Sequence, residues 1–258
     1  MRPSLWLAAA LLPLASACQA REAEAPQRPE LPALGLMGTI PIYWGEADAF
    51  GDVLNGRNSV HWARAQLERS YRLEPLDTLD AASLAPLDFL LLAQPRALTP
   101  AENVALDEWV RQGGRVLLFA DPMLTGNSRF AIGDRRRPQD VVLLSPILSH
   151  WGLRLEFDVE RPEGVALLDA GGARLPVNRP GRLAADSAAD DCAIDAEAVL
   201  ARCRIGEGEA LVIADAALLD LYQPHPGSAA ALAWLTREGF AESGEIAGRA
   251  PAGGTVRH

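Results

Sequence analysis

The chain has 258 residues, of which 49% are hydrophobic and 22% are charged, with 22 glycines and 19 prolines. This is the composition of a globular protein, and it excludes collagen-like, coiled-coil and wholly disordered chains. The formal net charge of -10 argues against a nucleic-acid-binding protein, because neutralising phosphates requires clustered Lys and Arg. The basic run 135–137 is too short to form such a cluster, so we expect no nucleic-acid partner.

Residues 1–17 have the pattern of a secretory signal peptide. Met1 and Arg2 give a positive start, residues 5–14 form an apolar run, and small residues follow at 15–17. The apolar run is too short to span a bilayer core of about 30 Å. It therefore predicts export and not a transmembrane helix.

Two cleavage sites compete at the end of this segment. Residues 15–17 suit an ordinary signal peptidase, whereas residues 14–18 (LASAC) resemble the bacterial lipobox, whose Cys becomes the acylated first residue of the mature protein. The leucine lies four residues before the Cys, where the lipobox has three. The lipobox predicts that Cys18 joins the protein to membrane lipid on the periplasmic face. Gln19 replaces the Asp that retains many lipoproteins at the inner membrane, which favours the outer membrane.

Four segments are predicted along the chain. After the signal peptide, residues 18–33 form a lipid-anchored linker that is rich in Ala, Pro and Glu and has no apolar periodicity. Residues 34–242 form the folded domain. The Gly- and Ala-rich residues 243–258 form a flexible tail.

Two cysteines remain once Cys18 is lipidated. We predict a disulfide between Cys192 and Cys203, because the chain is bound for an oxidising compartment. Free thiols and a metal site are the alternatives. The metal site is disfavoured, since the sequence has no CxxC motif and its four histidines are scattered. We expect neither a metal nor a cofactor.

The first half of the domain alternates strands with helices. Apolar runs of strand length cover 34–44, 88–94 and 115–120, and residues 61–71 have amphipathic helical spacing. The second and third runs are continuously apolar, which is typical of parallel strands covered by helices on both faces.

The clearest helix start is at Thr99. Its hydroxyl is an N-cap, Pro100 takes the first helical position, and Glu102 three residues after the cap completes a capping box. Gly113 and Gly114 predict the end of this helix.

The second half departs from this alternation because two glycine turns predict antiparallel hairpins. The whole pattern predicts an α/β fold with a doubly wound, mainly parallel sheet and an antiparallel hairpin insertion. The expected elements are a helix at 145–151, a strand at 153–159, a hairpin of 164–170 with 173–177, a hairpin of 197–205 with 209–214, and a helix at 228–238.

Two segments resemble a known family. ALDEWVRQGGRVLLFADP at 105–122 resembles the helix, double glycine and strand of the auxiliary domain of ABC-type transport systems of the gliding-motility kind. IGEGEALVIADAALL at 205–219 resembles the second signature of that family, and the resemblance covers 34–240. It implies a fold like that of flavodoxin and class I glutamine amidotransferases, with transporter subunits as envelope partners. Family members are often held by transmembrane helices, whereas this chain has a lipobox.

Polar residues follow several predicted strands. In an open parallel sheet, ligands bind beyond the carboxyl ends of the strands, so these residues predict a binding crevice. The alternative is that Asp121 and Asp215 cap the turns that follow them. The candidate crevice residues are Trp44, Glu46, Gln94, Arg96, Asp121, Asn127, Arg129 and Asp215.

No catalytic residue is predicted. An amidotransferase needs a nucleophilic Cys on a strand-to-helix turn, yet no predicted strand ends in Gly-x-Cys or Gly-x-Ser, and GxGxxG and GxxxxGK[ST] are absent. We therefore expect a non-catalytic binding or assembly subunit of an envelope transport system. The alternative is a solitary periplasmic small-molecule-binding protein or a hydrolase that uses Asp121 and Asp215.

Overall fold

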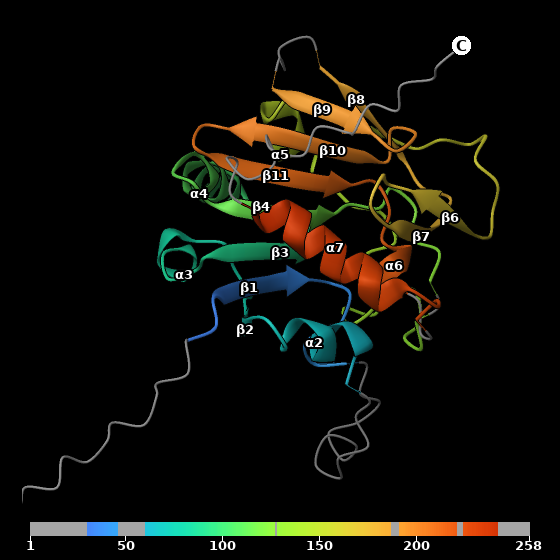
Figure 1. Cartoon of the computed structure of the whole chain (residues 1–258), viewed down its shortest axis with the longest axis horizontal. Helices are drawn as coiled ribbons and strands as arrows, with labels where there is room; N and C mark the ends of the chain where they lie inside the picture. The colour runs from blue at the N-terminus through green and yellow to red at the C-terminus, as the bar shows by residue number, and fades with distance from the viewer. Residues whose placement is uncertain (1–29, 46–59, 127, 187–190, 221–223, 242–258) are drawn as a thin grey trace, which may run out of the picture. The chain divides into compact units, whose positions relative to one another are not determined.

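A seven-stranded sheet forms the centre of the fold in the computed structural model (Figure 1). Five neighbouring strands are parallel, and two more extend the sheet antiparallel on one side. This confirms the mainly parallel sheet that the sequence predicted. In the order in which they lie, the strands are β2 (Arg72–Pro75), β1 (Ala33–Gly38), β3 (Phe89–Ala93), β4 (Arg115–Phe119), β11 (Gly208–Ile213), β10 (Leu200–Ile205) and β9 (Cys192–Asp195).

Several predicted features lie outside the part of the chain that the structure describes. They are the signal peptide, Cys18, Glu46, Asn127 and the C-terminal tail. Among the described residues, no helix is long and apolar enough to cross a membrane. The described ranges are 30–45, 60–126, 128–186, 191–220 and 224–241.

Helices cover both faces of the central strands. Helix α4 (Pro100–Arg111) lies behind the sheet in Figure 1, and helix α7 (Ser228–Phe240) crosses in front of it. The apolar runs of β3 and β4 are therefore buried on both faces, and Leu91 and Leu117 have no exposed surface. Burial of each such side chain contributes about 1.5–3 kcal/mol to the free energy of unfolding.

Helix α4 begins with the predicted capping box. The Thr99 hydroxyl accepts a hydrogen bond from the Glu102 amide at 3.2 Å, and the Glu102 carboxylate accepts one from the Thr99 amide at 2.8 Å. Arg96 adds an ion pair with Glu102 at 2.7 Å. The Arg96 guanidinium lowers the pKa of Glu102 to about 2. Arg96, a predicted crevice residue, is thus engaged at the start of α4.

Two predicted bounds were wrong in the first half. The helix expected at 61–71 is α2 (Trp62–Leu67), and it is followed by a turn in which the Ser70 and Tyr71 amides donate to the Leu67 carbonyl. The Tyr71 ring packs edge-on against Phe89 and Phe240, with ring centroids 5.9 and 5.8 Å apart. Strand β2 begins at the next residue. The strand expected at 34–44 ends at Gly38, since the next amide bonds to the Gln94 carbonyl and the chain then turns.

The antiparallel insertion lies between β4 and β11. Its hairpin about Gly171 and Gly172 is confirmed, with Leu168 of β6 (Val165–Asp169) opposite Leu175 of β7 (Arg174–Asn178). A second two-stranded sheet pairs β5 (Leu153–Glu156) with β8 (Arg182–Ala185). The other elements are α3 (Ala81–Leu84), α5 (Ser145–His150), β5 (Leu153–Glu156), β8 (Arg182–Ala185) and α6 (Ala217–Asp220), of which α3, β8 and α6, like β2 and β9, were not predicted.

A disulfide joins Cys192 to Cys203, as predicted. The two residues face each other across the antiparallel pair of β9 and β10. The bond therefore fastens the edge strand β9 to the rest of the seven-stranded sheet.

Candidate functional site

Two buried aspartates follow neighbouring strands of the sheet. Asp121 comes shortly after β4 and Asp215 shortly after β11, and each side chain is only 1% exposed. The two strands are parallel and in register, with Phe119 opposite Ile213. Their carboxyl ends therefore lie at the same edge, where the sequence predicted a crevice.

The Asp121 carboxylate is bonded to the backbone through both of its oxygens. Oδ1 accepts a hydrogen bond from the Met123 amide at 2.7 Å, which closes the turn after β4. Oδ2 accepts one from the Ala216 amide at 3.2 Å, which links this turn to the one after β11. Asp121 thus joins two turns that are far apart in the sequence.

The Asp215 carboxylate has the same arrangement. Oδ1 accepts a hydrogen bond from the Ala217 amide at 2.7 Å, at the start of α6. Oδ2 accepts one from the Asn178 amide at 2.9 Å, at the end of β7. Asp215 therefore ties the hairpin insertion to the central sheet.

The two carboxyl groups also repel each other. They accept bonds from the successive amides of Ala216 and Ala217, which places them side by side. Burial raises the pKa of Asp121 to about 6, and the charge of Asp220 adds to this rise. Burial also raises the pKa of Asp215, with repulsion from Asp121 and then Asp220 as further causes. The cluster therefore holds a proton more tightly than exposed carboxylates do.

Gln94 closes the same edge of the sheet from the β3 side. It is fully buried, and its φ of 49° lies in the left-handed region that is uncommon outside glycine. Its side-chain amide donates hydrogen bonds to the Asp121 and Gln139 carbonyls, both at 2.9 Å, and accepts one from the Asp121 amide at 2.8 Å. The Gln139 amide in turn donates to the Thr39 hydroxyl at 2.9 Å. The loop 121–144 is therefore tied across the carboxyl ends of β1, β3 and β4.

The structure brings Gln94, Asp121 and Asp215 together. Two other residues that were predicted to line the crevice, Trp44 and Arg129, are exposed. The Trp44 side chain is 69% exposed and lies edge-on to Tyr43, with ring centroids 4.8 Å apart. Arg129 is exposed on the loop 121–144. Within the described ranges, no three His, Cys, Asp or Glu side chains are grouped so as to hold a metal ion.

Two residues of the cluster were missed by the sequence analysis. Asp220 lies five positions after Asp215 in the sequence. A second carboxylate so close to a predicted crevice residue was the signal that could have identified it. Gln139 had no such signal, because its contact with Gln94 depends on the course of a long loop.

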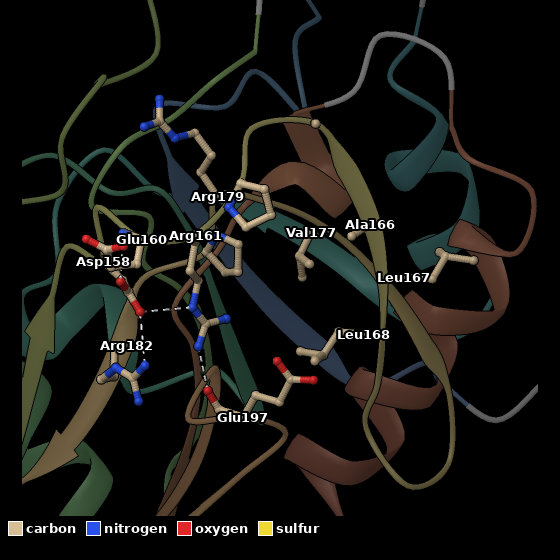
Figure 2. Close-up of a pocket in the computed structure, with 13 residues that line it drawn as sticks. Asp158, Glu160, Arg161, Ala166, Leu167, Leu168, Val177, Arg179, Arg182 and Glu197 are labelled. Atoms are coloured by element: carbon tan, nitrogen blue, oxygen red, sulfur yellow. Dashed lines mark hydrogen bonds and ion pairs between the residues drawn. The ribbon is translucent and has the colours of Figure 1, made fainter.

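A hollow of about 440 Å³ lies elsewhere, beside the β6–β7 hairpin (Figure 2). Leu168 and Val177 form its apolar side. On its polar side the Arg161 guanidinium lies between Asp158, at 3.4 Å, and the Glu197 carbonyl, at 2.6 Å. The residues that line it are Asp158, Glu160, Arg161, Pro162, Gly164, Ala166, Leu167, Leu168, Val177, Arg179, Pro180, Arg182 and Glu197.

A second hollow of about 400 Å³ lies under the turn of the same hairpin. Its lining combines one large aromatic side chain with four charged ones. The residues are Asp169, Ala170, Gly171, Ala193, Asp195, Ala196, Leu200, Arg202, Trp234 and Glu238.

We call Asp121, Asp215 and Asp220 with Gln94 and Gln139 the strand-end cluster. The fold and this cluster define an α/β protein with a mainly parallel sheet, an antiparallel hairpin insertion and strand-end carboxylates bonded to its own backbone. Residues 56–179 match the model of a family described as an ABC-type uncharacterized transport system. This match agrees with the family resemblance that the sequence predicted. The match runs from before α2 to just beyond β7 and includes Gln94 and Asp121.

Solved structures that match this chain have low sequence identity to it. The exo-beta-1,4-mannosidase Op5Man5 from Opitutaceae bacterium strain TAV5 is 14% identical with a TM-score of 0.42, covering 81% of this chain and 34% of that one. The mmIFT52 N-terminal domain is 14% identical with a TM-score of 0.48, covering 79% and 97%. A ThuA-like protein from Bacteroides uniformis ATCC 8492 is 9% identical with a TM-score of 0.43, covering 86% and 97%. This chain thus spans about a third (34%) of the length of the mannosidase. Comparison with curated proteins gives no match.

Proposed function

We propose that this protein is an exported lipoprotein whose non-catalytic domain acts as a binding and assembly subunit of an envelope ABC-type transport system. The main support is the state of the strand-end cluster. All four carboxyl oxygens of Asp121 and Asp215 accept backbone amides, and Gln94 binds the loop that crosses the same edge. Groups bonded in this way hold the protein together, which supports a structural role for the pair.

An amidotransferase-like or flavodoxin-like fold is part of this proposal. Numbered along the chain, the five parallel strands lie in the order 2-1-3-4-5, since β11 is the fifth. This is the strand order of flavodoxin-like sheets, in which ligands bind beyond the carboxyl ends of the first and third strands. Here Thr39 and Gln94 occupy that position and bond to Gln139, which favours a domain that has no ligand there.

Membrane anchoring through Cys18 is proposed from the lipobox. The disulfide between Cys192 and Cys203 supports an oxidising compartment, and therefore export. We place the protein on the periplasmic face, with the outer membrane favoured by Gln19.

The test of this proposal has two arms. In a strain that lacks the transport complex, Cys18→Ala should move the protein from the membrane fraction to the soluble fraction, because an acyl chain contributes about 0.8 kcal/mol per buried methylene. Cys18→Ser also lacks the acceptor thiol and should give the same shift, which shows that loss of the thiol is the cause. In a strain with the complex, transporter subunits should co-purify with the wild-type protein from solubilised membranes. Unchanged membrane partitioning of both variants would exclude the lipid anchor, and the absence of transporter subunits would exclude the assembly role.

The raised pKa values of Asp121 and Asp215 favour a second candidate function, that of a hydrolase or small-molecule-binding protein using this pair. Two close carboxyl groups that share a proton are able to act as general acid and base. A broad hydrolase screen of the purified protein tests it. Turnover that is lost by orders of magnitude in Asp121→Asn and Asp215→Asn would replace our proposal with the enzymatic one.

A further inference from the structure

The outer edge of β6 has free backbone hydrogen-bonding groups among the described residues. The Ala170 amide donates to the Ala173 carbonyl at 2.9 Å, which fixes the phase of the β6–β7 ladder. Because hydrogen-bonded pairs alternate in antiparallel strands, Leu168 directs its backbone groups toward β7 and Leu167 directs them away. Pro176, which has no N–H, lies opposite Leu167, in agreement with this phase.

Three residues of β6 therefore present their backbone groups outward: Val165, Leu167 and Asp169. The side chains of Val165 and Leu167 are 46% and 44% exposed. Exposed strand edges are normally protected by charged side chains, proline or a covering segment, because they pair readily with another strand. On β6, Asp169 is the one charged residue, so most of the edge is apolar and suited to pairing.

The two hollows described above are lined by successive residues of β6, and we call them together the β6 groove. Leu168 lines the first hollow and the next residue, Asp169, lines the second. On the opposite wall, Glu197 lines the first and the preceding residue, Ala196, lines the second. Figure 2 shows Leu168 directed toward Glu197 across this groove, with Leu167 on the other side of the strand. An extended segment lying beside β6 would therefore lie near both hollows.

The charge of the groove favours a basic occupant. Arg161 and Arg182 both pair with Asp158, and Arg202 pairs with Glu209 and Glu238. A fourth cation, Arg179, lines the first hollow and lies 3.9 Å from Glu163. Each of the four guanidinium groups therefore has a carboxylate partner within the protein, and Arg161 and Arg182 share one. No ion pair within the described ranges engages the four remaining carboxylates that line the groove, which belong to Glu160, Asp169, Asp195 and Glu197.

The hollow under the hairpin turn has the lining expected of a site for one cationic side chain. Trp234 forms its aromatic wall, and three carboxylates, those of Asp169, Asp195 and Glu238, line it with a single cation, Arg202. A Lys or Arg side chain on a tryptophan ring gains about 0.5–1 kcal/mol at an exposed site and more when it is partly buried. Gly172 lies against the Trp234 indole nitrogen, where a Cβ would collide with it, so the turn sits close on the ring.

We propose that β6 and its groove bind an extended basic segment of a partner protein, which adds a strand to the β6–β7 hairpin and places a Lys or Arg side chain against Trp234. This inference rests on the proposed function, because it names the surface by which an assembly subunit holds its partner. Main-chain hydrogen bonds to Val165 and Leu167 would give affinity, and the acidic hollow would give specificity.

The probe is a synthetic eight-residue peptide that alternates Val and Lys, added to the full-length protein in detergent. An alternating Val and Glu peptide tests charge, and a Val and Lys peptide with alternate N-methylated amides tests main-chain pairing. We expect the first peptide to bind, and the other two to bind at least tenfold more weakly. In hydrogen exchange, the first peptide should protect the amides of Val165, Leu167 and Asp169.

Variants assign the binding to this groove. Leu167→Pro removes an outward N–H without removing a bond to β7, and it should weaken binding at least tenfold, whereas Leu167→Val keeps the N–H and should bind as the wild type does. Asp195→Lys should also weaken binding at least tenfold, whereas Glu108→Lys, the same charge change on the exposed face of α4, should have less than a threefold effect. If Leu167→Pro disturbs the hairpin, the N-methylated peptide on the wild-type protein still tests the edge.

Several outcomes would overturn the inference. Equal binding of the Lys and Glu peptides would exclude the charge argument, and unchanged binding after N-methylation would exclude strand addition. A concentration-dependent dimer that Leu167→Pro abolishes would show that a second copy of this chain occupies β6 instead. If the wild-type protein does not bind the Val and Lys peptide but transporter subunits still co-purify with it, only this inference is overturned. Peptide binding without co-purification overturns only the proposed function.

Discussion

The strand-end cluster and the β6 groove use polar groups in opposite ways. At the carboxyl ends of β4 and β11, both oxygens of Asp121 and of Asp215 are bonded to the backbone in an almost fully buried place. Along β6, backbone groups point outward beside half-exposed apolar side chains and carboxylates that form no ion pair with any residue the structure describes. A doubly wound sheet ordinarily binds its ligands at the first of these places. On our proposal, the first place maintains the fold in this protein, and the capacity to bind lies in the inserted hairpin.

The largest effect on stability is expected from Asp215→Ala. The change leaves the amides of Asn178 and Ala217 without an acceptor, and each buried unpaired amide costs about 1–3 kcal/mol. We expect the free energy of unfolding to fall by about 4 kcal/mol, measured by urea denaturation. Asp215→Asn is the matched control, because it keeps one acceptor oxygen and should lose less. A loss below about 1 kcal/mol for Asp215→Ala would contradict the structural role of the cluster.

Removal of the disulfide should have the next largest effect. The double replacement Cys192→Ser and Cys203→Ser should lower the free energy of unfolding by about 3 kcal/mol, since the cross-link restricts the unfolded chain. The fold should persist, because β9 and β10 remain paired through their backbones. Circular dichroism and urea denaturation measure both quantities, and non-reducing mass mapping of the wild type verifies the bond. Free thiols in periplasm-purified protein would contradict the assignment.

The pH dependence of stability should reveal the carboxyl cluster. The folded-state pKa of Asp121, about 6, lies above its unfolded value, so its contribution is full below about pH 4 and is lost as the pH rises through 6. Relative to Asp121→Asn, the wild type should lose about 2 kcal/mol of stability between pH 4 and pH 7. Thermal and urea denaturation at several pH values measure this difference. Parallel pH profiles for the two proteins would show that Asp121 does not titrate in this range.

The smallest effect on stability is expected at the edge of β6. Val165→Thr and Leu167→Thr keep strand-forming side chains and the outward amides, so the free energy of unfolding should change by no more than about 0.5 kcal/mol. Peptide binding should fall because apolar contact is lost. A loss of several kcal/mol would instead mean that these side chains hold the hairpin, and the contrast between the two regions would fail.

The sequence predicted the elements that depend on local patterns. The apolar runs of β3 and β4, the capping box of α4 and the glycine turn of the β6–β7 hairpin are all present. The short strands β2, β8 and β9 were missed because each has only four residues and mixed polarity. They become strands because neighbouring chain segments supply hydrogen-bonding partners.

The candidate site was predictable in part. Asp121 and Asp215 were identified because they follow buried strands, and the structure places them together. Whether they cap turns or line a crevice depends on Asn178 and Ala216, which donate from other segments. The β6 groove was not predicted, because its walls come from residues 166–171 and 195–197, which meet only in the folded chain.

The place of the insertion also has a consequence for folding. β4 and β11 are neighbours in the sheet, yet α5 and β5 to β10 lie between them in the chain. As the chain is synthesised from its N-terminus, the edge of the apolar strand β4 that pairs with β11 stays unpaired until the insertion has been synthesised. Long-range parallel pairing of this kind is slow and exposes the intermediate to aggregation. We expect the nascent chain to depend on a chaperone until residues 208–213 arrive.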